Sequence, residues 1–409
     1  MSSSYRLFSV FGIEIEYMIV DVATLKVRPD AAAFLLTDDQ GTVLPDRETQ
    51  PIATSNELVA HLIECKTFHP ERNFLQVAED FASYVRHLNR ELQEIGAVLM
   101  PTAMHPLMNP VTETKLWKYE YHEIYAKYDE VFDCHRHGWA NVQSMHLNLP
   151  FSGDEEFNKL HRAVRFLLPI MSALSASSPI IEGKATGKMD SRLEYYRHHA
   201  DRVPSLVGDV IPESVQDEAD YRQKILEPIY RAMEGLDPEK IMGHEWMNAR
   251  GAIARFDRNA IEVRVLDSQE CPKADMAITE ILFLTLKWLV EEKDITAKLQ
   301  ESHDQKNLSA LFDAVADDAE KTMIHDLHYL TCFGLQNACT AQTLWMHIVE
   351  QVQAQVALTD SAKSFFALWC KSGCLSRRIV AHLQSHPLDA VYRELIHCLD
   401  RNEFFPLDH

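Results

Sequence analysis

Two short segments place charged side chains at every second position of an otherwise apolar, β-branched run. They are Gly12–Tyr17 (GIEIEY) and Ala260–Val265 (AIEVRV). Because alternate side chains of a β-strand share a face, the two glutamates of the first segment project together, as do the glutamate and the arginine of the second. This alternation predicts strands of an antiparallel sheet that has an apolar rear face and a charged inner face.

Four glutamates occur in such apolar, strand-like runs, and together they predict a metal site. Carboxylate oxygens are hard ligands that suit Mg²⁺ or Mn²⁺. Cα atoms two residues apart on a strand are separated by roughly 6.5 Å, so two glutamates can serve neighbouring ions or bracket one. One Glu-x-Glu pair is common on a solvated strand, whereas several together are informative. The four candidates are Glu14, Glu16, Glu64 and Glu262, and Glu57 stays outside the set as a residue at a segment start.

Composition restricts the class of protein. A chain of 409 residues with 46% hydrophobic content can bury a full core, and a formal net charge of −21 argues against sequence-independent nucleic-acid binding. The eight cysteines have no zinc-type spacing and are expected to be reduced. We find no apolar run suited to a secretory signal or a bilayer span, so we expect a cytoplasmic protein without membrane partners.

Hydrophobic periodicity predicts a single α+β domain with an antiparallel sheet, helices on one side and a helical C-terminal third. We assign residues 1–290 to a catalytic region and residues 291–409 to a helical region of the same domain. The predicted strands lie at Tyr5–Asp21, Glu57–Thr67, Ala97–Met104, Ala140–Leu149 and Gly251–Asp267, and the region through Pro51 is predicted as loop. The predicted helices cover Pro70–Ile95, Asp154–Ser177, Ala274–Glu292 and most of the chain after Ile295, and Ser178–Arg192 is predicted as a loop.

Four arginines lie within fifteen residues of this acidic chain, at Arg250, Arg255, Arg258 and Arg264. Guanidinium groups bind phosphate or carboxylate oxygens through paired hydrogen bonds. Surface ion pairs are the alternative, and they suit Arg258 better than Arg264, whose neighbours are apolar. The loop that ends at Arg192 has glycines one residue too close for a P-loop, but its Lys184, Thr186, Lys188 and Arg192 could cover an anionic substrate.

The ordered set of motifs resembles the glutamate–cysteine ligase type 2 family, which belongs to the broader group of carboxylate–amine ligases. No single motif is specific for this family, but the order in which the motifs occur over about the first 290 residues is specific for it. The matching pieces are Gly12–Asp21, Glu57 with Leu62–Thr67, His105–Pro106, Gln143–Asn148, Leu168–Pro179 with Thr186–Gly187, and Ala260–Asp267.

This resemblance implies a curved antiparallel sheet that forms a funnel, with ATP and two or three Mg²⁺ (or Mn²⁺) ions at its floor. It also implies that glutamate is phosphorylated on its side chain and then attacked by cysteine or another small amine. By position, Glu14, Glu16, Glu64 and Glu262 would be metal ligands, and Arg264 would contact the transferring phosphoryl group. His146 would lie near the nucleotide phosphates, Arg192 would clamp a phosphate or carboxylate, and we group Arg255 with the nucleotide-binding residues.

Three departures and two alternative functions accompany the resemblance. Ile15 stands where many relatives have an acid, Asp190 stands where the family has a serine, and the C-terminal third matches nothing. That third is a candidate for the amine pocket or for a homo-oligomer contact. The alternatives are a phosphotransferase or ligase that acts on another carboxylate, and a non-catalytic regulator that binds nucleotide or metal. Side chains that could select the amine include Trp117, Tyr119, Tyr121 and Trp246.

Overall fold

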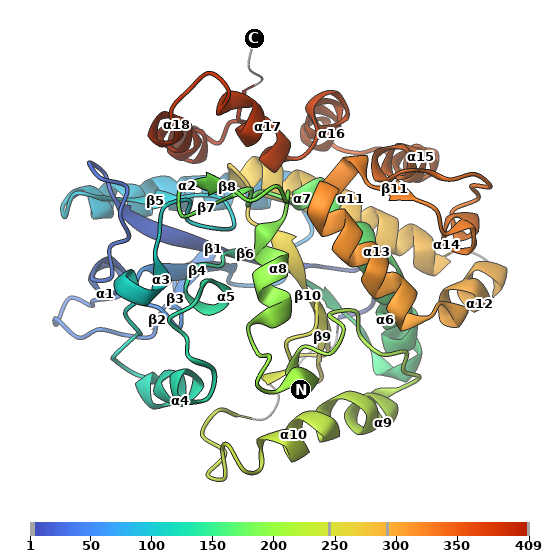
Figure 1. Ribbon diagram of the computed structural model, residues 1–409, viewed down its shortest axis with the longest axis horizontal. Coiled ribbons are helices and arrows are strands. Elements are labelled where there is room, and N and C mark those ends of the chain that lie inside the picture. Colours follow the sequence, from blue (N-terminus) through green and yellow to red (C-terminus); the bar gives the residue numbers. More distant parts are fainter. Residues whose placement is uncertain (1–4, 244–246, 292–293, 407–409) are drawn as a thin grey trace.

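An antiparallel sheet occupies the centre of the protein. The structure is a computed structural model that describes residues 5–243, 247–291 and 294–406. The strands of the main sheet are β1 (Gly12–Asp21), β2 (Asp46–Arg47), β3 (Ile52–Asn56), β4 (Leu62–Thr67), β5 (Ala97–Met100), β6 (Ser144–Pro150), β9 (Ala252–Arg255) and β10 (Ala260–Asp267). Within the described ranges these eight strands are ordered β2-β3-β4-β1-β6-β10-β9, and β5 pairs with the second half of β1 (Figure 1).

Strand register brings the predicted charged residues onto one face. Across the ladders of β1, Glu14 pairs with Lys66 on β4 and with His146 on β6, and Glu16 pairs with Glu64. The alternate residues of β1, which include Ile13, Ile15 and Tyr17, are completely buried on the other face. The predicted division into a charged and an apolar face is therefore confirmed.

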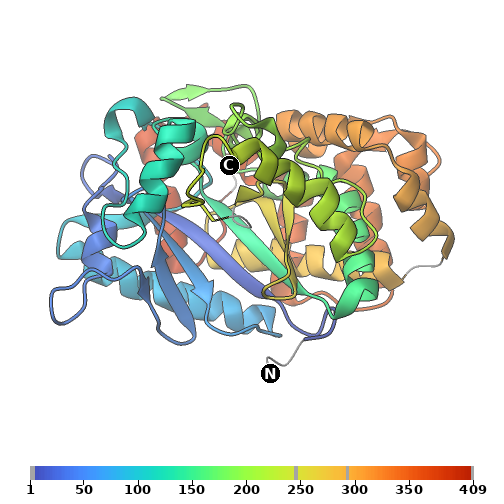
Figure 2. The same cartoon turned by 90° about the horizontal axis from the view of Figure 1, so that it is seen from below.

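Three long helices lie on the apolar side of the sheet: α2 (Phe74–Gln93), α6 (Gly153–Leu167) and α11 (Pro272–Glu291). The side chain of Asn73 caps α2 by accepting hydrogen bonds from two backbone N–H groups of its first turn. The inward residues Phe81 and Val85 of this helix share one core with Ile13 and Ile15 of β1. Figure 2 shows α2 along one side of the sheet and α4 (His122–Phe132) on the opposite side.

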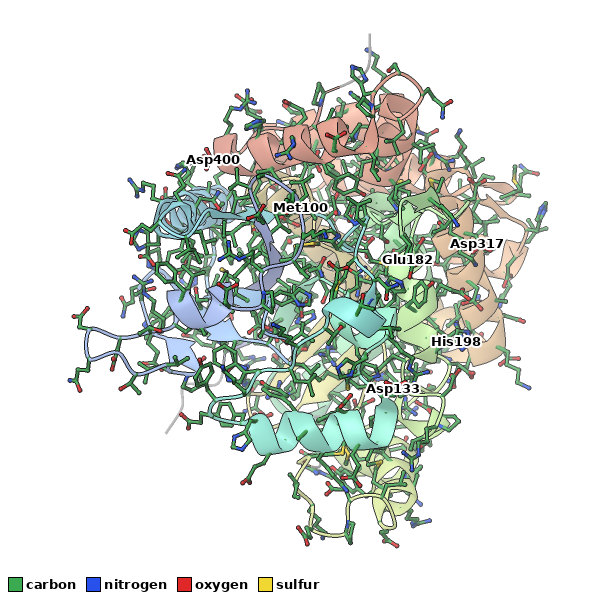
Figure 3. All side chains as sticks on the ribbon, turned by 60° about the vertical axis from the view of Figure 1, so that its left-hand side comes forward. Met100, Asp133, Glu182, His198, Asp317 and Asp400 are labelled. Carbon is green, nitrogen blue, oxygen red and sulfur yellow. The ribbon has the colours of Figure 1, made fainter. Side chains whose placement is uncertain are left out.

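The charged face of the sheet is covered by α4, by α5 (His137–Ala140) and by α8 (Ser191–His198). A short hairpin of β7 (Ile180–Ile181) and β8 (Lys184–Ala185) borders this side, with Glu182 and Gly183 at its turn. Figure 3 shows Glu182 at the hairpin and Asp133 at the end of α4. The remaining short helices are α1 (Ala31–Leu35), α3 (Pro110–Glu113), α7 (Ser172–Ser175), α9 (Glu218–Tyr221) and α10 (Glu227–Met233), with 3-10 turns at Leu168–Ile170, Pro204–Leu206 and Ala319–Lys321 and a π-helical turn at Arg222–Leu226.

The C-terminal third is helical, as predicted, apart from a small hairpin of β11 (Met323–Ile324) and β12 (Cys339–Thr340). Its helices are α12 (Asp294–Ser302), α13 (Gln305–Asp318), α14 (Leu327–Cys332), α15 (Ala341–Gln353), α16 (Asp360–Ser372), α17 (Leu375–His382) and α18 (Leu388–Arg401). Helices α15 and α16 pack against α11, and α18 packs against α2 and β5. The predicted α+β fold class is confirmed. No helix among the described residues has the length and apolar character needed to cross a membrane.

Helix α13 holds the segment that leads into α8, and the two helices lie side by side in Figure 1. The backbone N–H groups of Met189 and Asp190 donate to carbonyl oxygens of α13 at 3.0 and 2.9 Å. Lys188 pairs with Asp317 at 2.5 Å, and Arg197 pairs with Asp313 at 2.5 Å. The C-terminal third therefore positions α8 over the sheet.

Several boundaries differ from the prediction. The first strand begins at Gly12, and the region through Pro51 that was predicted as loop leads into β3, whose five residues are all buried and show no period-two alternation. The strand predicted from Glu57 begins at Leu62. The helix predicted over Asp154–Ser177 is interrupted at Pro169, which has no backbone N–H to donate. The predicted loop after Ser178 contains the β7–β8 hairpin, because Glu182 and Gly183 both adopt the positive φ that a tight hairpin turn requires.

Candidate functional site

The four predicted glutamates converge on the charged face of the sheet, together with His146. Glu14, His146 and Glu262 offer ligand atoms that all lie within 4.8 Å of one another, and Glu16, Glu64 and His146 form a second such group. The two groups share His146, so they are adjacent. Carboxylate oxygens with one imidazole suit a divalent cation such as Mg²⁺ or Mn²⁺.

A chain of hydrogen bonds orients His146 between the two groups. Its Nδ1 lies 3.0 Å from Glu14 Oε2, and its Nε2 lies 2.8 Å from the hydroxyl of Ser144. Ser144 in turn donates its backbone N–H and its hydroxyl to Glu16, at 2.6 and 3.0 Å. Burial opposes both charges, but the Glu14–His146 hydrogen bond prevails, so the pKa of Glu14 falls to about 2 and the pKa of His146 rises to about 9.

Glu64 and Glu57 lack this compensation. Burial and the nearby Glu14 raise the pKa of Glu64 to about 7, against the opposing effect of Lys66. Burial, Glu16 and Glu64 raise the pKa of Glu57 well above its usual value, and among the described residues its carboxylate accepts only a long hydrogen bond, 3.4 Å, from the backbone N–H of Leu58. Glu57 therefore belongs to the acidic cluster. It lies in the connection between β3 and β4, where no strand alternation marks it, although the motif resemblance includes it.

The arginine cluster of the sequence is divided by the fold. Arg264 and Arg255 approach the carboxylate of Glu262 at 3.1 and 3.3 Å, and Arg258 lies 4.0 Å from Glu14. Burial alone would lower the pKa values of both arginines, but Tyr196 and Glu262 hold the pKa of Arg264 above its usual range, and Glu262 and Asp257 do the same for Arg255. Arg250 instead pairs with Glu213 through two hydrogen bonds of 2.6 Å and is not part of the site.

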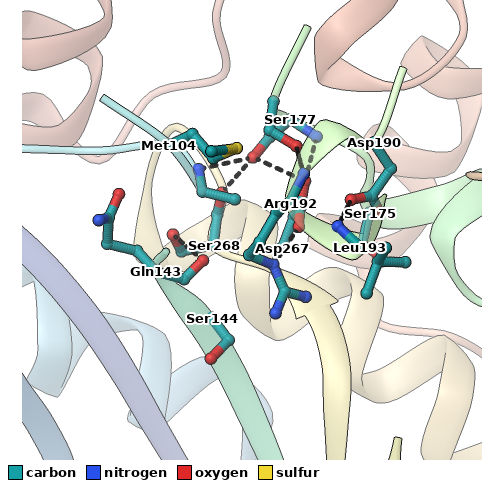
Figure 4. Close-up of polar contacts among 12 residues, drawn as sticks. Met104, Gln143, Ser144, Ser175, Ser177, Asp190, Arg192, Leu193, Asp267 and Ser268 are labelled. Carbon is teal, nitrogen blue, oxygen red and sulfur yellow. Dashed lines mark hydrogen bonds and ion pairs between the residues drawn. The ribbon is translucent and has the colours of Figure 1, made fainter. Parts of the chain in front are cut away.

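Arg192 is buried beside the site (Figure 4). Its Nε lies 2.5 Å from Asp267, and its Nη1 donates to the carbonyl oxygen of Arg264 at 3.4 Å. Its buried Nη2 has no hydrogen-bond partner among the described residues. An N–H donor in this position could bind an anion, as the clamp prediction requires.

The segment before Arg192 accounts for one departure from the family pattern. Asp190 caps α8 by accepting from the backbone N–H of Leu193 at 3.0 Å, a role that serine can also fill. Lys188 is bound to Asp317 and Glu194, away from the acidic cluster, and Lys184 is exposed on β8. The prediction that these two lysines cover the substrate therefore has no support in this conformation.

Three tyrosines lie over the charged face. Tyr125 accepts a hydrogen bond from Asn56 at 2.9 Å, and burial together with Glu57 raises its pKa. Burial also raises the pKa values of Tyr128 and Tyr196, while Arg264 opposes this effect in both. Of the residues suggested for amine selection, Trp117 is a core residue that is 2% exposed, Tyr119 packs against its ring, Tyr121 is exposed, and Trp246 lies outside the described residues.

Comparisons with known proteins show the family to which this chain belongs. The family model of glutamate–cysteine ligase family 2 matches residues 10–359. An uncharacterized protein of Archaeoglobus fulgidus is 30% identical over 89% of this chain and 92% of its own length. A Cronobacter sakazakii protein named "Putative glutamate–cysteine ligase 2" is 25% identical over 71% of each chain. The solved glutamate–cysteine ligase of Francisella tularensis, in complex with AMP, has a TM-score of 0.61 at 12% identity and covers 97% of this chain and 90% of that one, which is a likeness of fold. The chain belongs to glutamate–cysteine ligase family 2.

Proposed function

We propose that this protein is an ATP-dependent carboxylate–amine ligase that joins the side-chain carboxylate of glutamate to cysteine or another small amine. The observation that carries the proposal is the convergence of Glu14, Glu16, Glu64 and Glu262 around His146, with Arg264 beside them. Family membership supports the reaction class. The substrates and the roles of single residues are part of the proposal.

The donor set fits divalent cations. Glu14 and Glu262 would hold one ion, and Glu16 and Glu64 would hold another. His146 lies within reach of both groups and would be a ligand to one of the two ions, because a neutral imidazole has a single lone-pair nitrogen. The poorly compensated Glu57, which is half-buried, adds a further oxygen donor. Bound Mg²⁺ would neutralise phosphate oxygens during transfer. Because His146 is held protonated by Glu14, it must lose a proton before it can act as a ligand, so cation binding is expected to release protons.

The proposed reaction has two steps. A glutamate side-chain oxygen attacks the γ-phosphorus of ATP, the bond to ADP breaks, and an acyl phosphate forms. The amine nitrogen then attacks the carbonyl carbon, loses a proton and expels inorganic phosphate. Phosphoryl transfer depends mainly on positioning and on neutralisation of the equatorial oxygens. Arg264 and Arg255, which both approach Glu262, would contribute to this neutralisation. The Nη2 of Arg192, which has no hydrogen-bond partner among the described residues, would bind a phosphate or a substrate carboxylate.

The test is release of ADP by the purified protein with ATP, Mg²⁺, glutamate and a panel of amines, with the coupled product identified by mass spectrometry. ADP release should require all components, and Glu14→Gln should reduce it by at least about a hundredfold, as expected when a charge-stabilising group is lost. Glu227→Gln, on the exposed face of α10, is the control and should remain active. Equal ADP release without glutamate would refute the assignment of the donor.

A further inference from the structure

Lys66 on β4 is a cation inside the acidic cluster to which the proposed reaction assigns no role. It follows Glu64 by two residues on the strand, so both side chains share the charged face. Its ammonium group contacts Ser55 Oγ at 2.9 Å, Glu64 Oε1 at 3.4 Å and Asp46 Oδ1 at 3.4 Å. Among the described residues, Lys66 is the only cation in an ion pair with Glu64.

The position of Glu64 explains what the ammonium group of Lys66 does at this site, which is to offset repulsion between carboxylates. Glu64 lies directly across the ladder from Glu16, and like charges in that position destabilise a sheet. Ser55 donates one hydrogen bond to Glu64 at 3.2 Å. This neutral donor leaves most of the negative charge of Glu64 to be balanced by a cation. Lys66 supplies a positive charge between Glu64 and Asp46 and thereby reduces the repulsion across the ladder.

The contacts of Lys66 are suited to exchange. Its two ion-pair contacts are long, its shortest contact is to a neutral hydroxyl, and its side chain is 34% exposed. A lysine ammonium group is a compact charge on a flexible stem, so it can move by rotation within its own side chain. A divalent cation held by Glu16 and Glu64 would compete with Lys66 for the same carboxylate. Electrostatic repulsion would then move the ammonium group away from that cation.

We propose that Lys66 is an exchangeable counter-ion: it balances Glu64 until a divalent cation takes over that carboxylate, and it then pairs with the anionic ligand that accompanies the cation. This inference rests on the proposed function, because it requires a cation between Glu16 and Glu64. It makes Lys66 a positioning residue that couples cation binding to phosphate binding. Lys66 therefore has opposite effects on two affinities: it weakens binding of the cation alone and strengthens binding of the cation together with a polyphosphate.

The test measures two affinities in the full chain. Binding of Mn²⁺ alone is followed by electron paramagnetic resonance of the unbound ion, and binding of a non-hydrolysable ATP analogue is followed by calorimetry in saturating Mn²⁺. Lys66→Met should bind Mn²⁺ alone about tenfold more tightly and the analogue about tenfold more weakly, because one positive charge is removed from beside each ligand. Lys66→Gln, which keeps a donor for Ser55, should shift both affinities in the same directions. Lys66→Arg should stay close to the wild type.

Lys287→Met is the matched control, since this lysine lies in an exposed ion pair on α11, which packs on the apolar side of the sheet. It should change neither affinity. Weaker binding of both ligands by Lys66→Met and Lys66→Gln would indicate a purely structural role and overturn the inference, as would unchanged Mn²⁺ binding. A wild-type protein that binds neither Mn²⁺ nor the analogue would instead overturn the proposed function itself.

Discussion

Glu64→Gln is expected to stabilise the protein in the absence of divalent cations. Burial and Glu14 raise the pKa of Glu64 from 4.5 to about 7. The folded protein therefore holds this proton more tightly than the unfolded chain, so stability falls as the pH rises from 4.5 to about 7 and stays low above that. Each pKa unit corresponds to about 1.4 kcal/mol, so the ionised carboxylate costs about 3 kcal/mol at pH 8. For a chain of this length, removing that cost should raise the unfolding midpoint by about 3 °C.

The assay is scanning calorimetry at pH 8 and pH 5, in EDTA and then in saturating Mg²⁺. In EDTA, Glu64→Gln should unfold at a higher temperature than the wild type at pH 8, and the difference should shrink at pH 5. In Mg²⁺ the wild type should gain stability by mass action, and the variant should gain less because it has lost a ligand. Glu227→Gln, an exposed helical acid, serves as the control with little change in either condition. A variant that is less stable than the wild type in EDTA at pH 8 would refute the reasoning.

Three further predictions concern the packing around the site. His105 accepts hydrogen bonds from two backbone N–H groups at Nδ1, and burial lowers its pKa to about 4. Neutral His105 should therefore stabilise the fold fully above pH 6.5, and the protein should lose about 3 kcal/mol of stability as the pH falls to 4. In urea melts, a stability difference between wild type and His105→Gln that does not shrink on acidification would contradict this. A Cβ on Gly138 would lie 2.7 Å from a carbonyl oxygen of α8, so Gly138→Ala should cost about 1–3 kcal/mol, whereas Gly235→Ala, which meets open space, should be nearly neutral in the same melts. Asp267→Asn should cost about 3–5 kcal/mol because it leaves the buried Arg192 charge without its partner, and a variant as stable as the wild type by urea denaturation would rule this out.

The charged face can be predicted well from the sequence, because the alternation of charged and apolar residues is visible within each single strand. Period-two alternation in β1 and β10 assigns a face to Glu14, Glu16 and Glu262 wherever these strands lie in the sheet. Glu57 has no such signal, since it lies in a connection between strands. Arg250 and Arg255 both lie in the arginine-rich segment before β10, with no local signal that separates them. Only tertiary structure separates them, because Arg250 pairs with Glu213, which lies almost forty residues earlier and outside any shared motif.

The attachment of α8 to α13 limits how this chain can be recombined with its relatives. The backbone of Met189 and Asp190, which lead directly to Arg192, is bound to the end of α13. A chimera that exchanged the C-terminal helices would alter the segment before Arg192. It would preserve this segment only if the new helix had backbone carbonyl groups at the positions of Ala316 and Asp317 and acidic side chains at the positions of Asp313 and Asp317. Differences in catalytic behaviour among such hybrids would therefore arise from residues more than a hundred positions along the chain from Arg192 itself.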